Sequence, residues 1–344
     1  MSIWNILLAL FIFGLIILIH ELGHFLTAKA FGVKVEEFAI GIGPALLQFE
    51  GPETTYSLRL IPMGGFVQME GEEEESKDPR AFCRQSAWKR IIIISAGAIM
   101  NLILGLVVAM LIVNIRGHIG TTKIALFEEN AVSSQVLQLG DELIAINGSH
   151  IHVDNDIIYT LVRDSDGMVD MTVRRNGEKL DLTVPFATQT LEDGTISIAL
   201  DFKVLGQKPT LFGTLRYSVG WTISIAKQVW TALFELLSGQ HSLSQLSGPV
   251  GTTQVIGQAS AQGIGSLLMI IGFITVNLGV FNLLPVPALD GGRLLFLVIE
   301  LIRRKPIPAK YEGYVHAAGF ALLMALMIMV TYQDIMRLIT GQTI

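Results

Sequence analysis

Two histidines and a glutamate form a metal-site pattern near the start of the chain. The stretch His20-Glu21-Leu22-Gly23-His24 lies inside an apolar segment, residues 3–31. Residues four apart on a helix share one face, so His20 and His24 can reach the same metal ion. Glu21 then lies beside that ion and can serve as the base for the attacking water. In a soluble chain a five-residue pattern often arises by chance. Ionisable groups are costly inside a bilayer, however, so in this segment we favour a functional metal site.

A catalytic zinc needs a third protein ligand and one open position. Ala30 stands where a third histidine would follow in the metzincins. Asp290 is the best remaining carboxylate, because it lies in an apolar stretch next to glycines that allow close approach. We therefore predict Asp290 as the third ligand. Asp290 could instead cap a helix that begins near Leu294. Asn282 could bind the substrate or only form an interhelical hydrogen bond. Taken alone, neither residue distinguishes its two roles; together with the two histidines, the functional roles are favoured. The other histidines lack ligand spacing and are interpreted as ordinary: His118, His150, His152, His241 and His316.

Composition places this site in an integral membrane protein. Of 344 residues, 51% are apolar and only 16% are charged, which is too hydrophobic for an ordinary soluble chain. The net charge of −6 comes without a basic stripe, which argues against nucleic-acid binding. Cys83 is the only cysteine, so neither an intrachain disulfide nor a cysteine zinc cluster can form. The first apolar run is long and lacks a basic region before it, so we expect a retained span.

The ligands must be positioned by about four transmembrane helices, expected at residues 3–30, 91–115, 265–284 and 315–330. Lysines and arginines cluster in residues 31–90 and 303–314. Because cytoplasmic loops carry an excess of these residues, both segments are predicted to be cytoplasmic and residues 117–203 extracytoplasmic. His20 and His24 lie toward the cytoplasmic end of the first span. Asp290 lies at the end of the third span, so it can reach them only if that span also runs from the extracytoplasmic side to the cytoplasmic side. The amphipathic stretch 211–237 is therefore predicted to lie on the membrane surface, and residues 247–251 are read as a loop.

The predicted fold is an α-helical polytopic membrane protein with membrane-associated β-hairpins and one inserted α+β domain. Glycines among β-prone residues predict a cytoplasmic-side β region at 32–70 within the first part, 1–116. Residues 117–203 resemble a PDZ domain on the run 139–148 and the helical stretch 155–163, although no clear carboxylate-binding loop is present. Residues 204–262 are predicted to be an amphipathic region on the membrane surface, and residues 263–344 are predicted to carry the last two transmembrane helices.

The paired motifs together resemble the site-2 protease family (peptidase family M50), the intramembrane zinc metalloproteases. Residues 20–24 match its HExxH motif, and residues 282–291 match its second motif, which reads NxxPxPxxDG in this chain. The resemblance implies that His20, His24 and Asp290 bind Zn²⁺, that Glu21 is the catalytic base and that Asn282 contacts substrate. It implies substrates that are single-span membrane proteins trimmed beforehand, such as anti-sigma factors or signal-peptide remnants, in a bacterial inner membrane. This chain has room for one PDZ domain rather than two in tandem. The candidate substrate contacts in the β region are Gly41, Gly43, Gly64 and Gly65.

Two other classes of function fit part of the pattern. A membrane zinc transporter or sensor could use the same ligands without hydrolysis, but it would have no need of Glu21 between the histidines. A membrane-anchored PDZ scaffold would leave both histidines unexplained. The predicted activity is therefore zinc-dependent hydrolysis of peptide bonds within transmembrane segments.

Overall fold

The computed structural model describes residues 2–72, 74, 76–190, 196–239, 247–305 and 307–340, which leaves His241 outside the described residues. The chain forms two compact units, each treated by itself. The first comprises Met1–Val108 with Ala232–Met336, and the second comprises Ala109–Thr231 with Arg337–Ile344.

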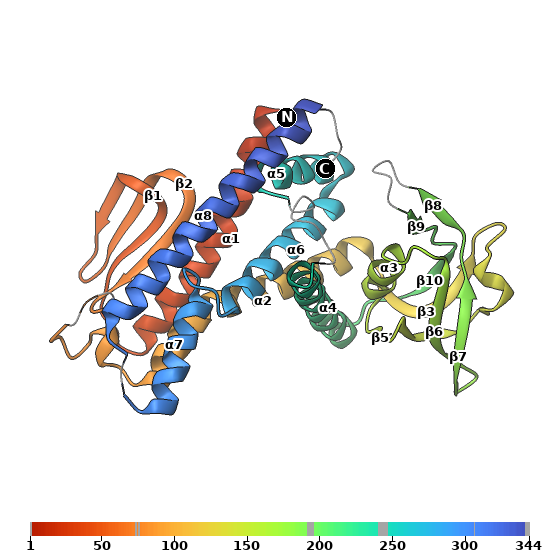
Figure 1. The fold of residues 1–344 in the computed structure, drawn as a ribbon, viewed down its shortest axis with the longest axis horizontal. Helices are drawn as coiled ribbons and strands as arrows, with labels where there is room; N and C mark the ends of the chain where they lie inside the picture. The colour runs from red at the N-terminus through yellow and green to blue at the C-terminus, as the bar shows by residue number, and fades with distance from the viewer. Residues whose placement is uncertain are drawn as a thin grey trace. The chain divides into compact units, whose positions relative to one another are not determined.

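Four helices of the described residues are long and apolar enough to cross a membrane. They are α1 (Ile3–Ala30), α2 (Ala87–Arg116), α6 (Ile264–Leu283) and α8 (Ala309–Thr340) (Figure 1). The helices predicted at 3–30, 91–115 and 265–284 are confirmed, and the fourth is longer than the predicted 315–330. Only 22% of the most apolar window of α1 is buried, and only 11% of that of α8. Apolar side chains on the outer surface are the pattern expected where lipid replaces water.

Small residues let the first two of these helices approach closely. A Cβ built on Gly23 of α1 would lie 2.5 Å from the carbonyl oxygen of Ala96 on α2. Backbone contact at glycine is how helices pack tightly in lipid, where apolar surface alone gives little driving force for association. This crossing brings the α2 backbone next to the turn of α1 that carries both histidines.

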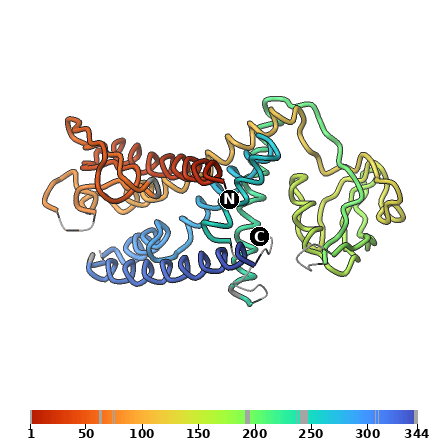
Figure 2. Tube along the Cα trace, turned by 90° about the horizontal axis from the view of Figure 1, so that it is seen from above, coloured from red at the N-terminus to blue at the C-terminus, as the bar shows by residue number. Residues whose placement is uncertain are grey.

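The predicted β region is confirmed as strands β1 (Val35–Glu50) and β2 (Thr55–Met69), which form a sheet beside α1 (Figures 1 and 2). Residues 35–40 pair with residues 65–69 on one side and with residues 55–58 on the other. Residues 65–69 consequently form an edge strand, and on its other side no strand pairs with it among the described residues. At Met69 the N–H and C=O on that side are hydrogen-bonded to Glu72 instead. An edge strand can accept an additional strand.

Two shorter helices differ from the sequence prediction. Residues 247–251 were predicted to be a loop, but α5 (Pro249–Gln262) begins at Pro249 with Gly248 as its N-cap. Proline is well tolerated at the first helical position because the amide hydrogen it lacks has no intrahelical partner there. The other helix, α7 (Asp290–Arg303), was expected from Leu294 but begins at Asp290 itself. Leu289 is its N-cap residue, so Asp290 is not a cap but the first helical residue.

The second unit contains a six-stranded sheet with the order β10-β3-β4-β6-β7, in which β5 pairs with β4. The strands and helix of this part are β3 (Ile119–Phe127), β4 (Glu142–Ile146), β5 (Ser149–His150), α3 (Asp154–Val162), β6 (Met168–Arg175), β7 (Glu178–Pro185), β8 (Thr188–Thr190), β9 (Ile196–Ile198) and β10 (Phe202–Gln207). Asn176 and Gly177 connect β6 to β7 with positive φ at both residues. That is the two-residue hairpin turn expected from an Asn-Gly pair. The PDZ assignment of this sheet and helix remains a prediction.

Helix α4 (Leu211–Leu237) follows the sheet. At 27 residues it is long enough to cross a membrane, but it is not among the four described helices whose length and composition together fit a membrane span. Its polar side chains face the N-terminal end of α3: Tyr217 donates a hydrogen bond to Asp154 at 2.7 Å, and Ser224 donates one to Asp156. The prediction that α4 lies on the membrane surface agrees with this amphipathic character, and its placement stays a prediction.

Candidate metal centre

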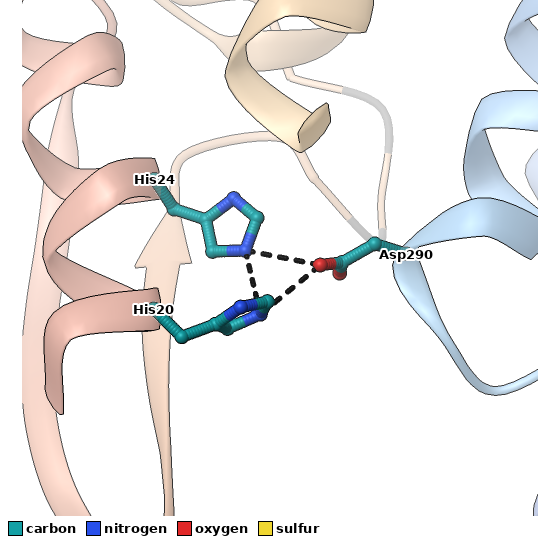
Figure 3. A group of neighbouring side chains, drawn as sticks. All are labelled: His20, His24 and Asp290. Carbon is teal, nitrogen blue, oxygen red and sulfur yellow. Dashed lines mark hydrogen bonds and ion pairs between the residues drawn. The ribbon is translucent and has the colours of Figure 1, made fainter. Parts of the chain in front are cut away.

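The structure brings the three predicted ligands together. His20 and His24 project from the same face of α1, and Asp290 approaches them from the start of α7 (Figure 3). The Nε2 atoms of the two histidines are 3.2 Å apart, and Oδ2 of Asp290 lies 3.1 Å from one and 3.2 Å from the other. Both histidines are buried. Residues about 270 positions apart in the sequence thus converge on one point. The histidines come from α1, and Asp290 comes from α7, directly after the turn that contains Pro285 and Pro287.

This geometry fits a tetrahedral zinc ion. With metal–ligand distances of about 2.0–2.1 Å, the ligand atoms of a tetrahedral site lie about 3.3 Å apart. The three observed separations are close to that value. Oδ2 of Asp290 is buried and has no hydrogen-bond donor among the described residues. Neutral imidazoles facing a carboxylate oxygen at this distance present lone pairs to a common point, which a cation would stabilise. Two histidines and one carboxylate are also a ligand set found in catalytic zinc sites.

A backbone carbonyl holds the His24 ring in a metal-binding orientation. Nδ1 of His24 lies 2.9 Å from the carbonyl oxygen of Ile93 on α2. A carbonyl oxygen can only accept, so Nδ1 carries the proton and Nε2 keeps its lone pair facing the other ligands. Donation from the second ring nitrogen to a carbonyl is the usual support for a zinc-bound histidine.

Asn101 of α2 supports His20 in the same way, which the sequence reasoning did not foresee. Its side-chain amide lies 3.3 Å from Nδ1 of His20, and the side chain is fully buried. Its Oδ1 has no hydrogen-bond partner within the part of the chain that the structure describes. Exchanging the amide oxygen and nitrogen lets Oδ1 accept the Nδ1 proton and leaves Nε2 of His20 free to bind metal. The isolation of Asn101 in a long apolar helix predicts an interhelical hydrogen bond, and the structure shows that its partner is His20 of α1.

A cavity of about 1070 Å³ opens onto the three ligands. Glu21 lines it, and so does the edge strand, residues 65–69 of β2. A Cβ on Gly65 would lie 3.0 Å from Cγ of Glu21, so this glycine allows the edge strand to pass directly over the predicted base. The other candidate substrate contacts are not among the lining residues: Gly41, Gly43, Gly64 and Asn282.

Ion pairs attach α7 to the elements around this cavity. Arg293, one turn after Asp290, pairs with Glu72 in the segment after β2. Glu300, farther along α7, pairs with Arg90 at the start of α2. These pairs attach the helix that carries Asp290 to α2 and to the segment that follows β2.

The four apolar helices and the converging side chains of His20, His24 and Asp290 define a helical membrane protein with a candidate metal centre. A family model described as peptidase family M50 matches residues 8–326. A putative zinc metalloprotease of Clostridium acetobutylicum is 39% identical, with 97% of this chain and 98% of the relative covered. The regulator of sigma-W protease RasP of Bacillus subtilis is 31% identical, with 98% and 100% covered. The chain belongs to peptidase family M50. It is a zinc-dependent metallopeptidase of the site-2 protease type.

Proposed function

We propose that His20, His24 and Asp290 bind the zinc ion and that the chain hydrolyses peptide bonds inside transmembrane segments. The observation that carries this proposal is the convergence of three ligand atoms within 3.2 Å of one another between helices with lipid-type surfaces. A hydrolytic site enclosed by membrane-spanning helices acts on a peptide bond that is itself within the membrane.

Zn²⁺ bound there would polarise the scissile carbonyl and increase the acidity of a water molecule. Glu21 follows His20 directly in sequence and lines the same cavity, so its carboxylate is placed to take a proton from that water. The same carboxylate then gives the proton to the leaving amine as the C–N bond breaks. Glu21 thereby returns to its starting state, and one water molecule is consumed for each bond cleaved.

The edge strand at residues 65–69 gives the substrate a place to bind. A transmembrane helix must unwind before cleavage because its carbonyls are engaged within the helix. Once extended, it can pair with the open side of residues 65–68 in the edge strand, which borders the cavity. Gly65 is the one candidate glycine that lines the cavity, so we assign the closest approach of substrate to that residue.

The remaining assignments rest on sequence pattern. We propose that residues 31–90 face the cytoplasm of a bacterial inner membrane, and that residues 117–203 are an extracytoplasmic PDZ domain that excludes substrates with bulky ectodomains. Single-span proteins such as anti-sigma factors or signal-peptide remnants would be the substrates, trimmed beforehand. The B. subtilis relative is named as a regulator of sigma-W protease, which supports the first of these classes.

The central test is Glu21→Gln in the full-length protein. We expect zinc content equal to wild type and no cleavage of a model transmembrane substrate, whereas His20→Ala should lose both. A transporter or sensor would keep its activity in Glu21→Gln, and cleavage by that variant at the wild-type rate would contradict the proposal.

Membrane topology has its own test. Single cysteines at Lys208 and Gly239, introduced into a Cys83→Ser background, should be labelled from the same side of the membrane. Labelling from opposite sides would mean that α4 crosses the bilayer, and the proposed orientation would be wrong.

A further inference from the structure

The turn that precedes Asp290 has an unusual backbone. Pro285 and Pro287 lie in the non-helical turn between α6 and α7, and Ala288 in the same turn has φ +74°. This is the left-handed region, which residues other than glycine and asparagine rarely adopt without support from their surroundings. Because Asp290 is only two residues away, the conformation at Ala288 sets the direction from which the carboxylate enters the site.

The support comes from α8. The backbone N–H of Ala288 donates a hydrogen bond to Nδ1 of His316 at 3.0 Å. One turn further along the same helix, Gly319 contacts the turn directly: a Cβ built there would lie 2.8 Å from the carbonyl carbon and oxygen of Pro287. His316 and Gly319 thus form one contact surface, with the hydrogen bond at one end and a backbone contact at the other.

The chemistry of this contact is specific. To accept from Ala288, Nδ1 must carry a lone pair, so the ring is neutral with its proton on Nε2. Leucine or phenylalanine would fill the space and leave the Ala288 N–H unpaired. Lysine and arginine present donors only. Asparagine can place its oxygen near the position of Nδ1, whereas the oxygen of glutamine lies one bond further out.

We propose that His316 is a positioning residue for the zinc site, acting on Asp290 through the 285–289 turn. Two of the three ligands have their spacing fixed by α1 alone, but the third comes from another element and needs its own support. This inference deepens the proposed function and rests on it: it assumes that Asp290 binds the metal. His316 does not line the 1070 Å³ cavity, but it lines a smaller cavity of about 380 Å³ together with Asp290.

The test uses full-length protein with His316→Leu, His316→Asn and His316→Gln. Zinc affinity is measured by competition with a chelator, and the cobalt-substituted proteins are compared by visible absorption. We expect His316→Leu and His316→Gln to bind zinc about 10–100-fold more weakly, with a changed cobalt spectrum, as when other supporting groups around a metal are removed. His316→Asn should bind zinc much as wild type does. Thermal unfolding of the metal-free proteins checks that each variant folds.

Equal zinc affinity and the same cobalt spectrum in wild type and His316→Leu would overturn the inference. So would equal losses in His316→Asn and His316→Gln, because that result would show a role in packing rather than in accepting the hydrogen bond. The Asn–Gln comparison remains decisive if His316→Leu fails to fold. Failure of the proposed function looks different: wild type and His20→Ala would then bind zinc equally.

Discussion

Gly97 of α2 lies against the imidazole of His24, and any side chain at this position would overlap Nε2, the predicted metal-binding atom. The same Cβ would lie 2.8 Å from Cε1 of His20. Gly97 therefore provides the space in which both rings turn toward Asp290. A helix that carries no ligand thus determines whether the ligands can adopt their positions.

Replacing Gly97 by alanine should impair zinc binding while the helices still form. We expect a loss of affinity of about 10–100-fold, the range seen when support for metal ligands is disturbed, measured by chelator competition. Gly265→Ala is the matched control, because a Cβ at Gly265 meets nothing within 4 Å. Wild-type zinc affinity in Gly97→Ala would mean that the histidines do not bind metal in the observed rotamers.

Asn101→Leu tests the second support of the site. Leucine has a similar volume but cannot accept the proton on Nδ1 of His20, so the ring loses the partner that fixes its tautomer. We expect zinc affinity to fall by about tenfold. Thr275→Val is the control: it removes only the hydroxyl that donates to the backbone oxygen of Asn101, at 3.2 Å. Similar losses in both variants would indicate that helix packing is responsible, and the assigned role of Asn101 would fail.

The sequence predicts the local part of this site and misses the part contributed by other helices. His20 and His24 are four residues apart on one helix, so their common face follows from helix geometry alone. Asp290 was found because few carboxylates occur in apolar surroundings. Gly97 and Asn101, by contrast, matter only because α2 crosses α1 at their level, and a single sequence does not specify which helix faces meet.

The same distinction explains the fold predictions. The hairpin at Asn176-Gly177 was predictable because two adjacent residues determine the turn. The start of α5 was missed because Gly248 and Pro249, read alone, break a helix. What makes them a helix start lies on α8: Oδ2 of Asp334 accepts the N–H of Gly251 at 2.8 Å. A partner more than 80 residues away decides between loop and helix.

The second unit should lose stability in acid through a single buried ion pair. Arg175 binds Asp141 through two hydrogen bonds of 2.7 and 2.8 Å, and the N–H of Gln138 donates to the same carboxylate. Burial alone would raise the pKa of Asp141, but these donors outweigh burial and hold its pKa below the usual range. The stabilisation is therefore complete above the unfolded pKa of about 3.9 and is lost as the pH falls through the lower pKa of the folded state.

Arg175→Met should destabilise this unit by about 3 kcal/mol at neutral pH, because it leaves a buried carboxylate without its cation. Hydrogen exchange of β4 and β6, followed by mass spectrometry in the full-length protein, measures the change locally. The difference from wild type should shrink below pH 3.9. Arg174→Met is the control: its pair with Glu142 is more exposed, and such pairs contribute about 0–1 kcal/mol. Equal effects of the two variants would contradict the prediction.

Asp334 should stabilise the first unit by joining α8 to α5. Its side chain is fully buried, and it accepts from the first turn of α5, where the unpaired N–H groups and the helix dipole favour a negative charge. Gly248 leaves room for it, since a Cβ there would lie 2.8 Å from Oδ2. Asp334→Ala removes a charged acceptor and should lower the free energy of unfolding by about 1.5–3 kcal/mol.

Asp334→Asn keeps an acceptor without the charge, so its thermal unfolding in detergent should fall between that of wild type and Asp334→Ala. Zinc affinity should stay unchanged in both variants, because Asp334 contacts α5 rather than the 285–289 turn. Wild-type thermal stability in Asp334→Ala would show that the hydrogen bond to Gly251 adds nothing measurable. The start of α5 would then have to depend on Pro249 and on its packing against α1 and α6 alone.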